Sequence, residues 1–205
     1  MNKKILILGF NGSPHKDGVV AKLLKSALQG ARRAGAQVEL IHLYDMHIER
    51  ESGIYSKDPK KANVKNLPKD DFRVLVPRII KADGLIFATP NYWANMSAVM
   101  KGLVERLTVL ENDGFRLRGK IAAFIAASKE NEGGLEMAAM SMVSALGQMG
   151  VLILPNGIMW HPGGKWTTLN HKAHESKSWA QEDAPLVGRN MVALAELLKD
   201  NPIKW

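Results

Sequence analysis

Cysteine is absent from the 205 residues of this chain, and long apolar runs are absent as well. A chain without thiols forms no disulfide, no thiolate metal site, no iron–sulfur cluster and no cysteine nucleophile. No apolar run approaches the roughly 18 residues of a membrane span, and the chain does not open with the segments of a signal peptide. We therefore expect a cytoplasmic protein that is not embedded in a membrane.

Acidic residues are the scarcer charge, since 20 Asp and Glu stand against 28 Lys and Arg, for a formal net charge of +8. A surface that binds nucleic acid gathers its basic residues in one patch or in a recognition motif. Here they are scattered along the chain, and no such motif accompanies them. We expect a basic, solvated surface that attracts small anionic substrates, and no nucleic acid among the partners.

Short apolar runs alternate with longer amphipathic stretches along the chain. This pattern predicts strands at 4–9, 37–43, 84–89, 121–127 and 150–156, and helices at 18–34, 70–82, 95–111, 134–149 and 184–199. Near-continuous apolar strands are typical of a parallel sheet that is covered on both faces. The pattern therefore predicts a doubly wound α/β fold with a five-stranded parallel sheet in flavodoxin-like order.

Two polar stretches, 44–69 and 157–183, interrupt this alternation, and neither is apolar enough for a second domain. We predict a single domain over 1–205, in which 157–205 is an extension that packs on the domain or on a neighbouring subunit. The last helix is expected to begin at Asp183 and Pro185.

Four of the five tryptophans lie in this extension, at Trp160, Trp166, Trp179 and Trp205. Tryptophan is enriched at subunit interfaces, which favours a homo-oligomer, and a small core within the extension is the alternative. His171 and His174 would share one helix face, but two ligands without a third are weak evidence for a metal, and we predict none.

The first predicted strand runs into a loop of small residues within 9–20 (GFNGSPHKDGVV). Gly18 is followed by valines rather than by Lys and Ser or Thr, which excludes a Walker loop, and the glycine spacing excludes a dinucleotide fingerprint. Ser13, backbone N–H groups and the start of the next helix are suited to a terminal phosphate. A tight turn whose glycines only permit the backbone geometry is an equally good interpretation of this loop alone.

Aromatic residues make up only 6% of the chain, yet two stand together after the third predicted strand. Tyr92 and Trp93 fall at the edge of the sheet where ligands bind in this fold class, and Asn95 or Ser97 can cap the next helix. Such a loop offers backbone amides and apolar walls to a planar ligand. Packing of the two rings under the neighbouring polar loop is the alternative.

The loop after the fourth predicted strand, 126–134 (AASKENEGG), is polar and ends in two glycines. Ser128, Asn131 and the backbone at Gly133 and Gly134 suit a hydroxylated chain or the polar edge of a ring. A plain connection from strand to helix is a comparable interpretation. Taken together, the three loops predict a site for a mononucleotide with a planar, multi-ring head.

Several segments together resemble the NAD(P)H-dependent FMN reductase family of flavodoxin-fold proteins, and within it the branch of iron–sulfur flavoproteins. The resemblance spans about residues 3–155 and is most distinctive at TPNYW-x-N-x-S-x-x-x-K, from Thr89 to Lys101. It also includes GSPHKDGVVAKLL after the first strand, DDF at Asp70–Phe72 and LRGKIAAFIAAS before the third loop.

This resemblance implies FMN as the cofactor, NAD(P)H as the co-substrate, and a homodimer or homotetramer. It implies phosphate contacts from Ser13, Gly18 and the backbone N–H groups of Val19 and Val20. It further implies contacts to the ring and ribityl chain from Pro90, Asn91, Tyr92, Trp93, Asn95, Ser128 and Gly133.

The chain departs from the family at two places. The family's phosphate loop usually ends in Gly-Asn-Thr or Gly-Asn-Ser, whereas Val19 and Val20 follow Gly18 here, so an amide and a hydroxyl are missing. His15 and Lys16 are the neighbouring residues that can supply charge to a phosphate instead. The cluster-bearing branch carries closely spaced cysteines after the second strand, and their absence means that no cluster can form.

These observations favour an FMN-dependent NAD(P)H oxidoreductase that passes electrons to a quinone, a free flavin or a similar small acceptor. Because the flavin carries the hydride chemistry, we predict no catalytic residue. A flavodoxin-like electron carrier is one alternative, although such carriers are typically acidic and this chain is basic. A flavin-binding or regulatory protein with a weakened FMN site is the other, and the two valines are its evidence.

Overall fold

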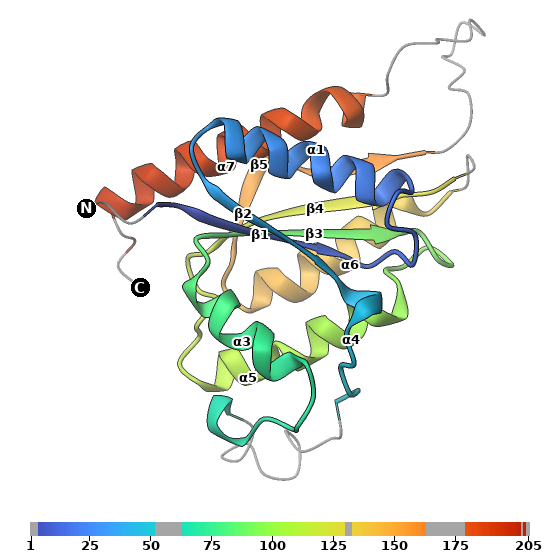
Figure 1. Ribbon diagram of the computed structural model, residues 1–205. Coiled ribbons are helices and arrows are strands. Elements are labelled where there is room, and N and C mark those ends of the chain that lie inside the picture. Colours follow the sequence, from blue (N-terminus) through green and yellow to red (C-terminus); the bar gives the residue numbers. More distant parts are fainter. Residues whose placement is uncertain (1–3, 52–62, 130–132, 163–178, 202, 204–205) are drawn as a thin grey trace, which may run out of the picture.

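Five parallel strands form one sheet in the order β2-β1-β3-β4-β5 (Figure 1). The structure is a computed structural model, and it describes residues 4–51, 63–129, 133–162, 179–201 and 203. The strands are β1 (Leu6–Asn11), β2 (Gln37–His42), β3 (Gly84–Pro90), β4 (Ile121–Ala127) and β5 (Leu152–His161). This strand order is that of flavodoxin-like doubly wound folds, which confirms the predicted fold class.

Helices cover both faces of the sheet (Figure 1). One face carries α1 (Val19–Arg33) and α7 (Trp179–Asp200), and the other carries α3 (Phe72–Lys81), α4 (Ala98–Arg106), α5 (Thr108–Asn112) and α6 (Leu135–Gln148). Two short 3-10 helices, η1 (Leu43–Asp45) and η2 (Val64–Asn66), lie between β2 and α3. The central strands β3 and β4 are buried along their whole length, as a parallel sheet between two helical layers requires.

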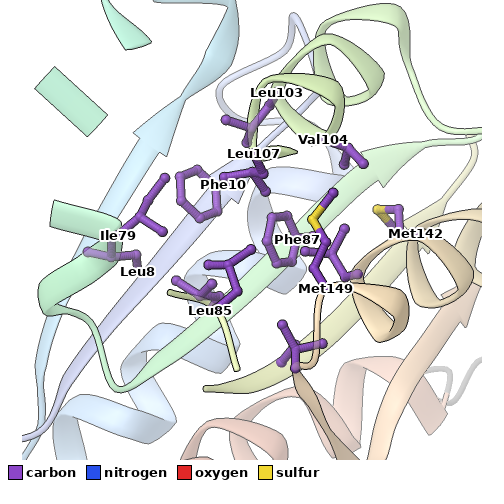
Figure 2. Packing of buried hydrophobic residues seen from close by; sticks show 14 of the residues in the cluster. Leu8, Phe10, Ile79, Leu85, Phe87, Leu103, Val104, Leu107, Met142 and Met149 are labelled. Atoms are coloured by element: carbon purple, nitrogen blue, oxygen red, sulfur yellow. The ribbon is translucent and has the colours of Figure 1, made fainter. Parts of the chain in front are cut away.

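Three phenylalanines at the same level of adjacent strands form the centre of the core beneath α3–α6. Phe10 pairs in register with Phe87, and Phe87 with Phe124. Their rings stack, with centroids 5.2 Å apart in the first pair and 5.9 Å apart in the second. Figure 2 shows Phe10 and Phe87 among leucines and methionines of the surrounding helices and strands. The ladder of rings fixes the relative level of three strands and therefore of the loops that follow them.

The predicted helix over 95–111 is two helices. Ser97 caps α4, because its side chain accepts a hydrogen bond from the Met100 N–H, so the helix begins at Ala98. The chain turns at Leu107, and α5 continues as a separate short helix. Ser97 is one of the two cap residues that the sequence predicted. The apolar pattern gave no sign of the interruption between α4 and α5.

The prediction that the last helix begins at Asp183 and Pro185 is wrong, since α7 begins at Trp179 with Pro185 inside it. The position is tolerated because α7 is supported by a close crossing with α1. A side chain at Gly30 would meet the Pro185 carbonyl oxygen at 2.0 Å, and one at Gly188 would meet the Ala27 carbonyl oxygen at 1.8 Å. Glycines therefore let the two helix backbones touch, and this packing offsets the hydrogen bond that a proline removes.

Strand β5 extends five residues beyond its predicted end. It leaves β4 after Ile153 and rejoins it at Ile158, opposite Phe124, with Asn156 in the left-handed region at φ 57°. Asn-Gly is a turn signal, so the sequence pattern ended the strand where the chain only bulges. Trp160 consequently lies in β5 and packs against a cluster that α6 and β4 form.

The other three side chains of the tryptophan argument, Trp166, Trp179 and Trp205, lie outside the residues whose side chains the structure describes, as do His171 and His174. The predicted homodimer or homotetramer stays a prediction. In the described parts of the chain, no group of three or more His, Asp or Glu side chains is placed to hold a metal ion. No described helix is long and apolar enough to cross a membrane.

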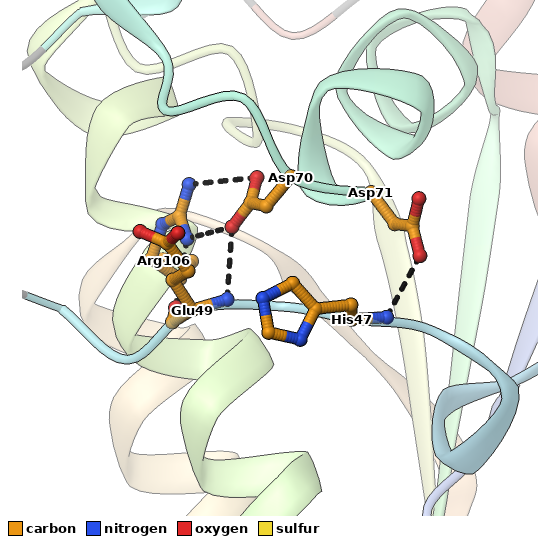
Figure 3. Close-up of polar contacts among 5 residues, drawn as sticks. All are labelled: His47, Glu49, Asp70, Asp71 and Arg106. Carbon is orange, nitrogen blue, oxygen red and sulfur yellow. Dashed lines mark hydrogen bonds and ion pairs between the residues drawn. The ribbon is translucent and has the colours of Figure 1, made fainter.

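A buried ion pair ties the chain after β2 to the helices below the sheet (Figure 3). Arg106 at the end of α4 pairs with Asp70 at 2.5 Å, and both side chains are almost fully buried. Asp70 also accepts from the Glu49 N–H at 2.9 Å, while Arg106 donates to the Glu49 carbonyl at 2.7 Å. The guanidinium further lies 4.6 Å from the centre of the Phe72 ring. The ion pair therefore binds both the backbone N–H and the backbone carbonyl of Glu49.

Removal of one partner from this pair leaves the other charge buried and uncompensated. We expect Arg106→Met to lower the free energy of unfolding by about 3–5 kcal/mol, as for other buried pairs that are broken on one side. Lys101 on the same helix pairs with Glu105 at the surface, and Lys101→Met should cost less than about 1 kcal/mol. Urea denaturation of the two variants measures the contrast. Equal losses would show that the buried pair does not anchor the chain.

Candidate functional site

Three loops meet at the carboxyl edge of the sheet, at 12–18 after β1, at 91–97 after β3 and, after β4, at 128–129 and 133–134. Asn131 of the predicted third loop lies outside the described residues. The Ser97 hydroxyl donates to the Gly12 carbonyl at 2.7 Å, which joins the first loop to the second. The Asn91 side chain donates to the Gly133 carbonyl at 3.0 Å, which joins the second loop to the third. The sheet edge therefore brings together all three loops that the sequence singles out, and hydrogen bonds fix their relative positions.

The first loop is organised by Asn11, the last residue of β1, whose side chain is fully buried. Its Oδ1 accepts from the Ser13 N–H at 3.1 Å, and its Nδ2 lies 3.4 Å from the Ser13 carbonyl. The Ser13 Oγ in turn accepts from the His15 N–H at 3.1 Å. Since that bond uses only a lone pair, the hydroxyl proton of Ser13 remains able to donate to a ligand.

Helix α1 begins at this loop with its N-terminus uncapped by any side chain. The first intrahelical bond runs from the Lys22 N–H to the Gly18 carbonyl at 3.0 Å. The N–H groups of Val19, Val20 and Ala21 precede that bond and have no partner among the described residues. Because the first turn carries no acidic residue either, this end of the helix is suited to an anion.

The two valines contribute to this loop through their backbone. The Val20 side chain is 2% exposed and packs in the core under α1, and Val19 packs at its margin. Neither side chain offers a polar group to a ligand. What remains available at the start of α1 is the two backbone N–H groups, and their contact with a phosphate stays a prediction.

Two lysines at the first loop, one in the loop and one in α1, are already paired with acidic residues. Lys16 contacts Asp45 of η1 at 2.6 Å, and Lys25 of α1 contacts Asp17 at 2.8 Å. The predicted contribution of Lys16 to phosphate binding therefore requires it to share or exchange its partner. His15 is exposed beside them and stays a predicted phosphate contact.

The second loop forms a tight turn from Tyr92 to Asn95, closed by hydrogen bonds in both directions at 3.0 and 3.1 Å. Trp93 and Ala94 occupy its two central positions with φ of 53° and 57°, a region that L-residues other than Asn and Asp rarely adopt. The Trp93 side chain is fully exposed. An exposed tryptophan on a strained turn gains nothing from packing in the described structure, which points to a binding role.

A pocket of about 780 Å³ opens at this turn, lined by Asn91, Tyr92, Trp93, Ala94 and Gly133. Its volume lies within the range of sites for small ligands and cofactors. Burial, and then the neighbouring Tyr44, raises the pKa of the Tyr92 phenol, so Tyr92 presents a protonated hydroxyl at neutral pH.

Asn91 carries the one unsatisfied atom among the buried polar side chains that the structure describes. Its Oδ1 has no hydrogen-bond partner, although the residue is only 7% exposed and its Nδ2 and backbone N–H are bonded to Gly133 and Ala127. An unpaired buried acceptor is costly unless a ligand donates to it. The acceptor belongs to a residue that lines the pocket, so it indicates a bound group with an N–H or O–H.

The third loop is fixed to β5 and to the aromatic turn. The Ser128 N–H donates to the backbone carbonyl of His161. Burial of the His161 imidazole lowers the pKa of that side chain. Gly134, at φ 90°, is the N-cap residue just before α6, and a side chain there would meet the Ala94 Cβ at 2.5 Å. Gly133 has open space around it and faces the pocket. The two adjacent glycines thus have different roles.

Two site residues escaped the sequence analysis. Asn11 shapes the first loop and Ser97 joins it to the second, but only the capping role of Ser97 was predicted. Asn11 is the last residue of an apolar strand and stands directly before Gly-Ser. A single amide side chain at the end of a buried strand was the signal that could have identified it.

Pro90 is buried at the end of β3. Its carbonyl accepts a hydrogen bond from the Thr89 hydroxyl, and that hydroxyl accepts one from the Ser97 N–H.

Comparison with known proteins agrees with this geometry. The family model for NADPH-dependent FMN reductase matches residues 5–164. The chain belongs to the NADPH-dependent FMN reductase family. This match covers the sheet and all three loops, and it confirms the resemblance to FMN reductases.

Curated relatives of this chain include iron–sulfur flavoproteins, NAD(P)H dehydrogenases (quinone) and a flavodoxin. An iron–sulfur flavoprotein of Archaeoglobus fulgidus is 32% identical over 157 residues, which are 76% of this chain and 74% of the relative. An NAD(P)H dehydrogenase (quinone) of Brucella anthropi is 25% identical over 152 residues, 74% of this chain and 70% of the relative. The iron–sulfur branch is therefore among the relatives, although this chain has no cysteine for a cluster.

Solved structures of similar fold include flavin-binding proteins. RosB, with a bound 8-demethyl-8-formylriboflavin-5'-phosphate intermediate, superposes with a TM-score of 0.75 at 20% identity, over 97% of this chain and 82% of RosB. An NAD(P)H:quinone oxidoreductase from Methanothermobacter marburgensis superposes with a TM-score of 0.62 at 20% identity, over 93% and 98% of the two chains. At these identities the likeness establishes the shared flavodoxin-like fold.

The adjacent glycines of the third loop provide a matched test of the site's construction. Gly134→Ala should lower the free energy of unfolding by about 2 kcal/mol, because the left-handed conformation strains an L-residue and the new Cβ displaces Ala94. Gly133→Ala meets no atom within 4 Å and should stay within about 0.5 kcal/mol of the parent. Urea denaturation compares them. Equal stability of the two variants would contradict the close approach of the aromatic turn to α6.

Proposed function

We propose that this protein is an FMN-dependent NAD(P)H oxidoreductase that passes electrons to a quinone or a similar small acceptor. The observation that carries the proposal is the set of unused polar groups at the carboxyl edge of the sheet. These are the N–H groups at the start of α1, the Ser13 hydroxyl proton and the Asn91 Oδ1. The family match and the relatives named as quinone dehydrogenases support it.

The unused groups fit the parts of FMN. Donors gather at the first loop, where a dianionic phosphate requires them, and an acceptor lies at the second loop, where a ring imide or a ribityl hydroxyl can donate. The pocket beside Tyr92 and Trp93 offers flat apolar surface to a planar ring. A ligand with a phosphate at one end and a flat, hydrogen-bonding head at the other satisfies both loops together.

The residues proposed to hold FMN fall into two groups. Ser13, Gly18, Val19 and Val20 would bind the phosphate through one hydroxyl and backbone N–H groups, with His15 and Lys16 adding positive charge. The ring and ribityl chain would contact Pro90, Asn91, Tyr92, Trp93, Asn95, Ser128 and Gly133. Bound there, FMN supplies the hydride-accepting and electron-donating chemistry of the reaction.

The protein's own contribution to the reaction is to position and shield. The aromatic turn and the third loop border the pocket and limit the access of water to it, while the α1 N-terminus fixes the anionic end. None of the described residues around the pocket is required to move a proton for hydride transfer, and we assign no catalytic residue. The net charge of +8 favours the approach of the anionic pyridine nucleotide.

Turnover by the purified protein tests this function. After addition of FMN, the protein should oxidise NADPH or NADH in the presence of benzoquinone well above the rate of free FMN at equal concentration. Reduction that requires a separate reductase protein would instead identify an electron carrier. A protein that ignores FMN altogether would contradict the proposal and leave a binding or regulatory role.

Trp93 allows flavin binding to be tested without disturbing the fold. Because the side chain is fully exposed, Trp93→Ala should change the free energy of unfolding by less than about 0.5 kcal/mol. Loss of a stacking surface should weaken FMN binding about tenfold, which corresponds to about 1.4 kcal/mol. Quenching of flavin fluorescence during titration measures the dissociation constant. Trp93→Phe, which retains an aromatic face, should bind nearly as tightly as the parent.

Unchanged affinity and an unchanged flavin absorption spectrum in Trp93→Ala would remove the aromatic turn from the proposed site. The phosphate end of the site would then have to be tested by itself.

A further inference from the structure

The last residues of β1 and β2 face one another at the edge of the sheet. Asn11 pairs in register with His42, and the Asn11 Nδ2 lies 2.9 Å from the His42 Nδ1. Neither His42 nor this contact belongs to the residues that the sequence assigned to the site. The contact connects the edge strand to the residue that shapes the first loop.

The chemistry of the neighbouring groups determines where the protons of this contact lie. The Ser13 N–H can only donate, so the Asn11 atom 3.1 Å from it must be the carbonyl oxygen. The amide nitrogen of Asn11 therefore faces His42, and it too can only donate. Hence the His42 Nδ1 must accept, which requires a neutral imidazole with its proton on Nε2.

Protonation of His42 would set an N–H against the N–H of Asn11. The amide could regain a bond to the ring only by turning over, and its NH₂ group would then face the Ser13 N–H. Either arrangement breaks one of the hydrogen bonds that shape the first loop. The charge state of His42 and the conformation at Ser13 are therefore linked through Asn11.

We propose, on the basis of the proposed function, that His42 is a positioning residue of the phosphate loop. Its neutral ring holds Asn11, and through it Ser13, in the conformation that receives the phosphate of FMN. Protonation of the ring weakens that hold, so flavin binding depends on pH through a residue that does not contact the flavin.

The charged groups around His42 form two ion pairs, each of one lysine and one aspartate. Lys16 of the loop is paired with Asp45 of η1, and Lys25 of α1 is paired with Asp17 of the loop. Burial is the main cause that lowers the pKa of His42 from its ordinary 6.5, the two lysines lower it further, and the two aspartates act in the opposite direction. A lowered pKa means that the folded protein binds fewer protons at this site than the unfolded chain. The hydrogen bond is thus complete above pH 6.5 and is lost as the pH falls through the lowered pKa.

Nuclear magnetic resonance of the flavin-free protein tests the link directly. The Ser13 amide signal should titrate with the pKa of His42 in the parent and should not titrate in His42→Asn, whose Oδ1 takes the place of Nδ1 as a permanent acceptor. Asn11→Leu keeps a buried side chain of similar size but removes the donor. It should raise the pKa of His42 by about 0.7, the equivalent of one ordinary hydrogen bond.

Flavin titrations at pH 7.5 and at a pH well below the pKa of His42, as the resonance titration measures it, test the consequence for binding. The phosphate of FMN changes its own charge near pH 6, and this acts equally on parent and variant. The ratio of their dissociation constants isolates His42: between pH 7.5 and a pH well below the pKa of His42, the parent should lose about fivefold more affinity than His42→Asn, again the equivalent of one hydrogen bond. His42→Leu, which lacks the acceptor, should bind more weakly than His42→Asn at both values.

Two results would overturn this inference. A Ser13 amide that is indifferent to the titration of His42 would show that the ring and the loop are not linked. A parent that gains affinity on acidification relative to His42→Asn would make His42 a direct charge partner of the phosphate. If FMN binds neither protein, the proposed function fails, while the flavin-free titration still decides whether His42 positions the loop.

Discussion

The amide of Asn11 is fully buried where β1 ends, and a buried amide must find partners for all its polar atoms. Those partners are the backbone of Ser13 and the ring of His42, one ahead along the chain and one on the adjacent strand. These contacts fix the backbone at Ser13, in the loop that leads into α1. The proposed phosphate end of the site depends on that constraint, and the Ser97 hydroxyl links the first loop to the second.

Polar groups at the carboxyl edge divide into two classes. One class forms hydrogen bonds that join the three loops to one another. The other class has no bond within the described residues: the first N–H groups of α1, the hydroxyl proton of Ser13 and the Asn91 Oδ1. A protein that had lost its ligand would be expected to close such gaps with side chains or to bury the aromatic turn. Here a fully exposed Trp93 lies on a strained turn at the pocket, where the proposed function places a planar ligand.

Periodicity and turn chemistry predicted the five strands, their order and the three loops, because apolar runs and glycine-rich turns are local signals. Three details could not be predicted from local sequence. The bulge of β5 at Asn156 looks like a strand end, Pro185 is tolerated in α7 only because Gly188 and Gly30 let α1 approach, and His42 has meaning only beside Asn11. Each depends on a contact between segments far apart in the chain, which no pattern in one segment reveals. The side-chain contacts to FMN remain predictions for the same reason.

The central claim is that the first loop and the start of α1 bind the phosphate of a flavin mononucleotide. Calorimetric titration of the flavin-free protein with FMN and with riboflavin, which lacks the phosphate, tests it most directly. One charge-assisted hydrogen bond contributes about 1.5–3 kcal/mol, so FMN should bind at least about tenfold more tightly than riboflavin, and added salt should narrow the difference. Equal affinity for the two flavins would contradict the claim, because the loop would then hold no phosphate.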